Sequence, residues 1–329
     1  MKITSCIHQI KIPIPDNPLK HINCYIIEGR DGWIMIDSGW YTEEAFNVLL
    51  KSLMDLGLTP KDISTIIITH IHPDHFGLAG KIKQISPKIR LFMHQWEASM
   101  IETRYVKVSE LKDKMTLMLQ SHGVPPVDSA TLESAYLPDL DSILVTFPDL
   151  VLYGGEIIGT GMYDLEVIWT PGHSPGHICL FEPENGLLFS GDHMLPSITP
   201  NVSFNIQSGD NPLGSYLYAL NKLKNLPVKK VLPGHEEPFT SFRNRINQIF
   251  HHHDQRKFEV QRAIADKTLN AWEISSQITW NTPVEWEDLS PLHMRSAVTE
   301  TIAHLELLRC EGKVRRIRKD TSIFYTINQ

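Results

Sequence analysis

The chain has 329 residues, a formal net charge of −7 at pH 7, and hydrophobic and charged fractions of 42% and 21%, as is ordinary for a globular protein. The acidic balance argues against a polyanionic ligand, because nucleic-acid binding usually rests on a strong positive field. No apolar run approaches a membrane span, and the N-terminus lacks the apolar core of a signal peptide, so we expect no membrane partner. The 4 cysteines are scattered singly. They are expected to be inert thiols in a reducing cytoplasm.

The first forty residues predict an antiparallel sheet. Apolar and polar positions alternate at Ile10, Ile12 and Ile14, and an apolar strand is expected over residues 33–36. That strand runs into the turn Asp37-Ser38-Gly39. Residues 43–56 then carry apolar side chains at helical spacing, which predicts the first helix.

The segment after the next strand is the most informative part of the chain. Residues 63–68 are short, apolar and β-branched, which is typical of a buried strand, and a helix is expected over residues 76–85. Between them lie His70, His72, Asp74 and His75. Imidazole nitrogens and carboxylate oxygens are the ligands that zinc prefers, and they also suit iron and manganese. The sequence therefore predicts a metal site at this turn.

Three later strands end in the same way, with a glycine followed by a ligand-type residue. The expected strands at 165–169, 187–189 and 230–232 lead to His173, Asp192 and His235. Glycine allows a tight turn and a close approach of the backbone to a site. These strand ends can therefore converge on one point together with the first histidine cluster.

Taken together, these motifs resemble the metallo-β-lactamase superfamily of hydrolases over roughly residues 1–245. The resemblance implies a four-layer αβ/βα sandwich. It assigns a first metal ion to His70, His72 and His173, and a second to Asp74, His75 and His235. Asp192 would bridge the two ions, as in the glyoxalase II-like binuclear branch of thioesterases, lactonases and phosphodiesterases.

Two divalent ions about 3.5–4 Å apart can hold and activate a bridging hydroxide, which would attack a polarised carbonyl. Zinc is the expected metal, with iron and manganese as alternatives. Asp74 is expected to be catalytic, guiding the proton of the hydroxide. Asp37 is interpreted as an acceptor that orients a metal-binding histidine. The alternative is that Asp37 merely caps its turn.

The resemblance also implies a helical cap insertion, here at about residues 97–148. Its apolar stripes include Met115 and Met118, which are candidate substrate-binding residues because methionine adapts to varied apolar ligands. The alternative is that these stripes only pack the cap onto the sandwich. His193, next to Asp192, is a third candidate for contact with substrate.

Residues 246–329 predict a separate domain. A long helix carries His251, His252 and His253, which point in different directions and are interpreted as a solvated face. Helices at 271–278 and 291–310 and a terminal hairpin then follow, a pattern that resembles a winged helix. The wing at 313–319 is basic, whereas residues 297–308 of the preceding helix contain no Lys or Arg.

The leading hypothesis is a binuclear metal-dependent hydrolase of a small ester, thioester or lactone. One alternative is a metal-dependent phosphodiesterase or endoribonuclease whose winged helix holds nucleic acid through the basic wing. Another is a non-enzymatic regulator that senses a ligand and binds DNA, against which the complete ligand set argues. A small-molecule substrate is favoured, and self-association into a homo-oligomer is left open.

Overall fold

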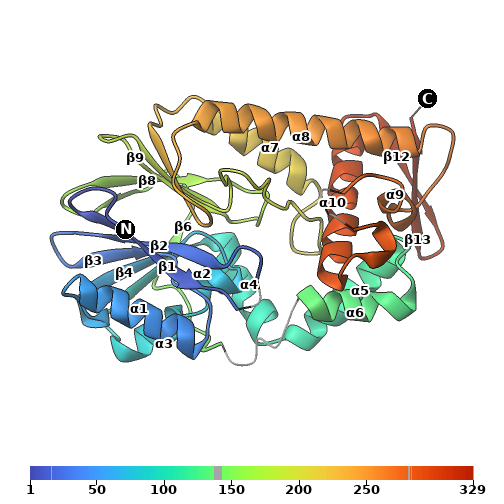
Figure 1. Ribbon diagram of the computed structural model, residues 1–329. Helices are drawn as coiled ribbons and strands as arrows, with labels where there is room; N and C mark the ends of the chain where they lie inside the picture. The colour runs from blue at the N-terminus through green and yellow to red at the C-terminus, as the bar shows by residue number, and fades with distance from the viewer. Residues whose placement is uncertain (16, 137–142, 281, 283, 329) are drawn as a thin grey trace. The chain divides into compact units, whose positions relative to one another are not determined.

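The computed structural model describes residues 1–15, 17–136, 143–280, 282 and 284–328 (Figure 1). The chain forms two compact units built from discontinuous segments. The first unit contains Met1–Val106, Asp141–Pro200 and Ala219–Ile246, and the second contains Lys107–Leu140, Asn201–Tyr218 and Asn247–Gln329. Residues 137–142 of the expected cap insertion lie outside the described residues. Among the described helices, none is long and apolar enough to cross a membrane.

Two mixed β-sheets make up the centre of the first unit. The six-stranded sheet has the order β1-β2-β3-β4-β5-β6, with strands Ile7–Pro13, His21–Ile27, Trp33–Ile36, Ile63–Ile68, Arg90–His94 and Leu150–Leu152. Its pairs from β3 to β6 are parallel and the others antiparallel. The five-stranded sheet has the order β11-β10-β9-β8-β7, with strands Lys230–Pro233, Leu187–Gly191, Ile178–Glu182, Asp164–Trp169 and Ile157–Gly159. Only its β10–β11 pair is parallel.

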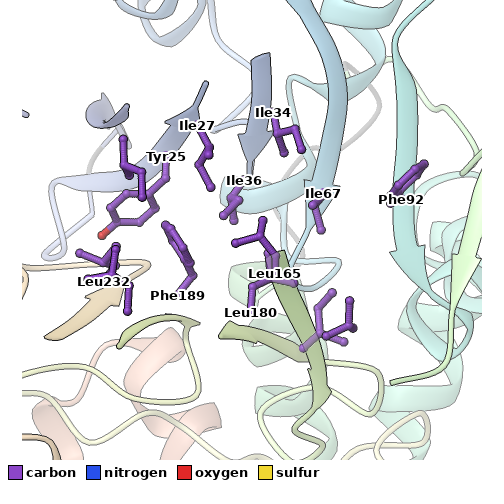
Figure 2. Packing of buried hydrophobic residues seen from close by; sticks show 14 of the residues in the cluster. Tyr25, Ile27, Ile34, Ile36, Ile67, Phe92, Leu165, Leu180, Phe189 and Leu232 are labelled. Atoms are coloured by element: carbon purple, nitrogen blue, oxygen red, sulfur yellow. The ribbon is translucent and has the colours of Figure 1, made fainter. Parts of the chain in front are cut away.

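The core of the first unit lies between these two sheets (Figure 2). Ile36 and Ile67 from the six-stranded sheet belong to the same buried cluster as Leu180 from the five-stranded sheet. The rings of Tyr25 and Phe189 meet edge to face across it, with centroids 5.2 Å apart. Each such buried side chain contributes about 1.5–3 kcal/mol of transfer free energy. This shared core fixes the spacing between the edges of the two sheets, where the candidate ligands lie.

The helices wholly within the first unit are α1 (Glu43–Asp55), α2 (Pro73–Phe76), α3 (Ala79–Ile85) and α4 (Gln95–Tyr105), with the 3₁₀ turn Pro60–Asp62 before β4. In Figure 1, α1 and α3 lie along the outer face of the six-stranded sheet. The helix expected over 76–85 is instead shorter, because α2 ends at Phe76, with Gly77 as its C-cap, and a separate helix α3 begins at Ala79. A Cβ atom at Gly77 would come within 2.9 Å of the Gly39 carbonyl oxygen, so the chain needs glycine at this close approach.

The second unit contains α5 (Val108–Ser121), α6 (Pro126–Tyr136), α9 (Ala271–Ser275), α10 (Pro291–Cys310), the 3₁₀ turn Trp286–Asp288 and the hairpin β12–β13 (Val314–Lys319 and Ser322–Ile327). Helices α7 (Pro212–Leu223) and α8 (Phe242–Ala263) carry residues of both units. The expected helices and terminal hairpin are therefore present, although α9 is shorter than expected. The winged-helix identification stays a prediction.

Helices α5 and α6 share a core with the C-terminal segment inside the second unit. Leu119 and Leu132 belong to the same buried cluster as Ile302 and Tyr325. The fully buried Arg295 lies 3.1 Å from the carboxylate of the buried Glu133, which ties α10 to α6. The apolar faces of α5 and α6, which are part of the expected cap, thus pack within the second unit. The role of the cap as a cover over a site stays a prediction.

The interpretation of the three consecutive histidines as a solvated face is wrong for one of them. His251 is exposed, but His253 is 1% exposed and its Nδ1 lies 3.1 Å from Nε2 of His304 on α10. Burial lowers the pKa of both imidazoles, that of His304 to about 3. These two histidines are therefore neutral core residues of the second unit.

Candidate metal centre

The predicted ligands follow strands whose C-terminal ends share an edge of each sheet. Strands β3 and β4 are parallel neighbours, so Asp37 and the segment 70–75 emerge at the same edge of the six-stranded sheet. Strands β10 and β11 are also parallel, and they bring Asp192 and His235 together. A hydrogen bond from Ile178 N to Thr69 O, 3.0 Å long, links the two edges.

His70, His72 and His173 form one group of side chains that could hold a metal ion, which we call the first subsite. Nε2 of His70 and Nε2 of His173 lie 2.9 and 3.0 Å from Nδ1 of His72. Burial lowers the pKa of His70 and of His72 well below the usual value. Both imidazoles are therefore neutral, which is the form that binds a metal.

Asp74, His75 and His235 form a second such group, the second subsite. Oδ2 of Asp74 lies 3.2 Å from Nε2 of His235 and 3.7 Å from Nε2 of His75. Burial alone would lower the pKa of His75, but Asp37, Asp192 and Asp74 raise it well above the usual value. The surrounding carboxylates thus favour a positive charge at this position, whether a proton or a metal ion.

Asp192 lies between the two subsites. Its Oδ1 is 3.4 Å from Nε2 of His75, and its Oδ2 is 3.5 Å from Nε2 of His235 and 3.7 Å from Nε2 of His173. Burial would raise the pKa of Asp192, but the facing His235 and His75 hold it well below its usual value. An ionised carboxylate in this place can contact ions in both subsites, as the sequence-based hypothesis requires.

Two of the nitrogen atoms that point away from the cluster, Nδ1 of His75 and Nδ1 of His235, have hydrogen-bond partners. Nδ1 of His75 lies 2.8 Å from Oδ2 of Asp37, which is 1% exposed. Nδ1 of His235 lies 2.9 Å from the His21 carbonyl oxygen. Asp37 also accepts hydrogen bonds from the amide and hydroxyl of Thr69, and it adopts a left-handed backbone conformation with φ 57°. Such contacts fix the tautomer and the direction of a metal-binding imidazole.

The side chains present fit divalent metal ions. Among the described residues, Nε2 of His75, Nε2 of His235 and Oδ1 of Asp192 are buried atoms with no hydrogen-bond partner. A buried polar atom without a partner is costly, and these three point at one another from separate strand ends. Histidine nitrogens and carboxylate oxygens are also the ligand types of catalytic zinc. The cluster is therefore a candidate centre for one or more ions.

Three further predicted site residues are described by the structure and do not belong to these groups of possible ligands. His193 is fully buried, its ring centroid lies 5.8 Å from that of His177, and burial lowers its pKa to about 3. Full burial does not favour direct contact with substrate. Met115 and Met118 are on α5 in the second unit, where Met115 is buried and Met118 packs against the core cluster. Their substrate-binding role stays a prediction.

Sequence reasoning missed His177, which holds the backbone of Asp192. Its Nε2 accepts a hydrogen bond from Asp192 N at 3.1 Å, and its Nδ1 lies 2.8 Å from Oγ1 of Thr170. The signal was present as a second Pro-Gly-His triplet, Pro175-Gly176-His177, directly after the one that contains His173. Only the folded chain shows that this second histidine faces the Asp192 amide.

The fold and this cluster of histidines and aspartates define a metal-dependent hydrolase with two face-to-face mixed sheets. Residues 18–235 match the model of the metallo-beta-lactamase superfamily, and the chain belongs to that family. It is 27% identical over 324 residues to the probable metallo-hydrolase YqjP of Bacillus subtilis (strain 168), covering 96% of each chain. A crystal structure of a metallo-beta-lactamase family protein from Thermus thermophilus superposes with a TM-score of 0.81 at 29% identity, covering 99% of this chain and 100% of that one.

Two other relatives carry names that state a reaction. The acyl-coenzyme A thioesterase MBLAC2 of Bos taurus is 25% identical over 229 residues, covering 66% of this chain and 74% of that protein. The hydroxyacylglutathione hydrolase GloC of Haemophilus influenzae is 26% identical over 219 residues, covering 65% of this chain and 84% of that protein. Both names describe hydrolysis of a thioester.

Proposed function

We propose that this protein is a binuclear metal-dependent hydrolase, of the glyoxalase II-like branch, that cleaves a small thioester, ester or lactone. The observation that carries the proposal is the position of Asp192, whose carboxylate lies within 3.7 Å of histidines from both subsites. An aspartate between two ligand groups suits a pair of ions rather than a single one. The two thioester-hydrolysing relatives support a substrate of the same bond type.

In this proposal one ion would be held by His70, His72 and His173, and the other by Asp74, His75 and His235. Asp192 would be a ligand common to both. Divalent ions, with zinc the expected metal, supply Lewis-acid chemistry that activates water and stabilises charge developing on a carbonyl oxygen. Asp37 and the His21 carbonyl oxygen would hold His75 and His235 in the metal-binding tautomer, because each accepts at Nδ1 and leaves Nε2 for the ion.

Asp74 is the residue we assign to proton movement. Its side chain is 14% exposed, against 0% for the neighbouring His75 and His235, so substrate and water can reach it. Interactions with His75 and His235 outweigh the effect of burial and lower its pKa. The oxygen of the ionised carboxylate that does not face the ion would then accept a proton from the attacking water and return it to the leaving thiol or alcohol.

We further propose that α9, α10 and the hairpin form a winged-helix-like fold. We also propose that this fold does not bind nucleic acid. Several wing cations are already used within the second unit. Nη1 of Arg316 lies 3.2 Å from the buried Glu306, Nζ of Lys313 lies 2.8 Å from Glu311, and Nε of Arg318 donates to the Asp320 carbonyl oxygen. A cation that is already paired within the fold contributes less binding free energy when it contacts a phosphate.

The test is a turnover assay of the metal-loaded full chain against an acyl-thioester panel, lactones and labelled single-stranded RNA. Hydrolysis of a thioester or lactone is expected, and Asp192→Ala should abolish it because a ligand common to both ions is lost. Asp164→Ala, at an exposed aspartate on β8, is the matched control and should keep wild-type turnover. Cleavage of RNA alone, or full activity of Asp192→Ala, would reject the proposal.

A further inference from the structure

Glu97, near the start of α4, is a buried carboxylate with no part in the mechanism above. It is 0% exposed. Its Oε2 accepts a hydrogen bond from Ile71 N at 2.8 Å, and its Oε1 accepts one from Gly176 N at 2.6 Å. Burial raises the pKa of Glu97, while these two amide hydrogen bonds act in the opposite direction. A buried carboxylate is tolerated only where such donors replace its water.

Those two amides belong to the two loops that carry the first subsite. Ile71 lies between His70 and His72, and Gly176 lies three residues after His173. One carboxylate therefore bridges two segments that are about a hundred residues apart in the sequence. Each of its oxygens serves one loop, and hydrogen bonds to a charged acceptor are roughly twice as strong as neutral ones.

Further contacts hold these loops and the end of β8 against α4. The Tyr105 hydroxyl, at the end of the helix, donates to the Ile71 carbonyl oxygen, so α4 binds both backbone groups of that residue. At Gly176, an added Cβ atom would come within 2.8 Å of Glu97 N and 2.9 Å of Glu97 Cγ, so the loop packs directly on the helix. The His94 ring, before the helix, stacks on Trp169 with centroids 5.4 Å apart.

We infer that Glu97 is a positioning residue that sets the spacing of His72 and His173 and thereby the metal affinity of the first subsite, an inference that rests on the proposed function. The second subsite has a separate anchor, because His75 is held by Asp37 and His235 by the His21 carbonyl oxygen. No ligand of the second subsite lies on the loop that Glu97 holds at Gly176. Loss of the Glu97 carboxylate should thus affect the two subsites unequally.

Glu97→Gln is the sharpest perturbation. A glutamine has nearly the same shape, but one of its two oxygens becomes an NH₂ group, which cannot accept a hydrogen bond from an amide N–H. One loop is then released while the other stays bound. Glu102→Gln makes the same chemical change at an exposed position of the same helix and is the matched control. Tyr105→Phe, which removes the hydroxyl contact to Ile71, is a second and milder variant.

The experiment titrates metal-free, full-length protein with Co²⁺ or Zn²⁺ against a competing chelator, with the thermal unfolding of the metal-free protein followed in parallel. For Glu97→Gln we expect one of two equivalents to bind about 10–100-fold more weakly, the other to bind with unchanged affinity, and the Co²⁺ absorption spectrum to change. Tyr105→Phe should weaken the same equivalent to a smaller extent. Glu102→Gln should match wild type.

The outcomes separate this inference from the function on which it rests. Wild-type protein that takes up no metal refutes the proposed function, and the inference with it. Wild-type protein that binds two ions, beside a Glu97→Gln variant with unchanged affinity for both, overturns the inference alone. Equal weakening of both equivalents also overturns it, because that result indicates a general structural role. If Glu97→Gln does not fold, unchanged affinities in Tyr105→Phe would overturn it instead.

Discussion

Asp37→Asn should weaken metal binding by reversing the tautomer of His75. Oδ1 of Asp37 accepts from the Thr69 amide at 2.8 Å, so the asparagine must keep its oxygen on that side. Its NH₂ group then faces Nδ1 of His75, 2.8 Å from the present Oδ2. Because this NH₂ group is a donor, it cannot face an N–H at Nδ1. The ring proton should therefore move to Nε2 of His75, where it occupies the lone pair that would bind the metal. The expected loss is about 10–100-fold in affinity for one ion, or about 1.4–2.7 kcal/mol.

The assay is a competitive Zn²⁺ titration of the metal-free variant, with Asp31→Asn at an exposed position as the control. Since the Thr69 contacts to Oδ1 survive, the free energy of unfolding of the metal-free protein should fall by only about 1–3 kcal/mol, the cost of one unmade buried contact. Wild-type affinity for both ions in Asp37→Asn would refute the assigned role of Asp37 and leave it as a turn residue.

The other predictions concern the second unit. The pKa of buried His304 is about 3, below the unfolded value of about 6.5. As the pH falls below about 6.5, the unfolded chain gains a proton at this histidine and the folded chain does not, so the free energy of unfolding is lower by about 2 kcal/mol at about pH 5. His304→Gln should flatten the pH dependence of chemical denaturation, and an unchanged slope would contradict this assignment. Glu133→Ala should lower the free energy of unfolding by about 3–5 kcal/mol, because it leaves Arg295 charged and buried. Urea denaturation measures this loss, with Ser134→Ala at the exposed neighbouring position as the control. A loss no larger than that of the control would contradict the assigned ion pair. Neutralising the basic residues of β12 should leave turnover of a small substrate unchanged, and a steep loss would favour a polyanionic substrate.

The strands and the ligand cluster could be predicted from sequence because their signals are local. Residues 63–68 form the expected strand, and the ligand-type residues at the ends of β4, β8, β10 and β11 come together as the glycine-containing turns indicated. Hydrophobic patterning fixes which residues enter a strand, and parallel pairing then fixes which strand ends meet. The contact between Asp37 and His75 is the one that the orienting role requires, while the role itself stays a prediction.

The features that the sequence did not predict depend on contacts between segments that are distant in the chain. A single glutamate in a helix gives no sign that it reaches two loops, so Glu97 could not be recognised. The stripes on α5 and α6 predicted buried faces but not their partner, which is α10 in the second unit. His253 was misread although it shares a helix face with Ile246, Ile249 and Val260, whose spacing along α8 indicates the buried side.

The metal content of the purified, reconstituted full chain tests the central claim most directly. Elemental analysis after removal of loosely bound ions should give about two divalent ions per chain for wild type, because Asp192 lies within 3.7 Å of histidines from two groups that could each hold an ion. Asp192→Ala should lower that number, and Asp164→Ala should not. A wild-type content that stays at one ion or none after reloading would contradict the binuclear hydrolase account.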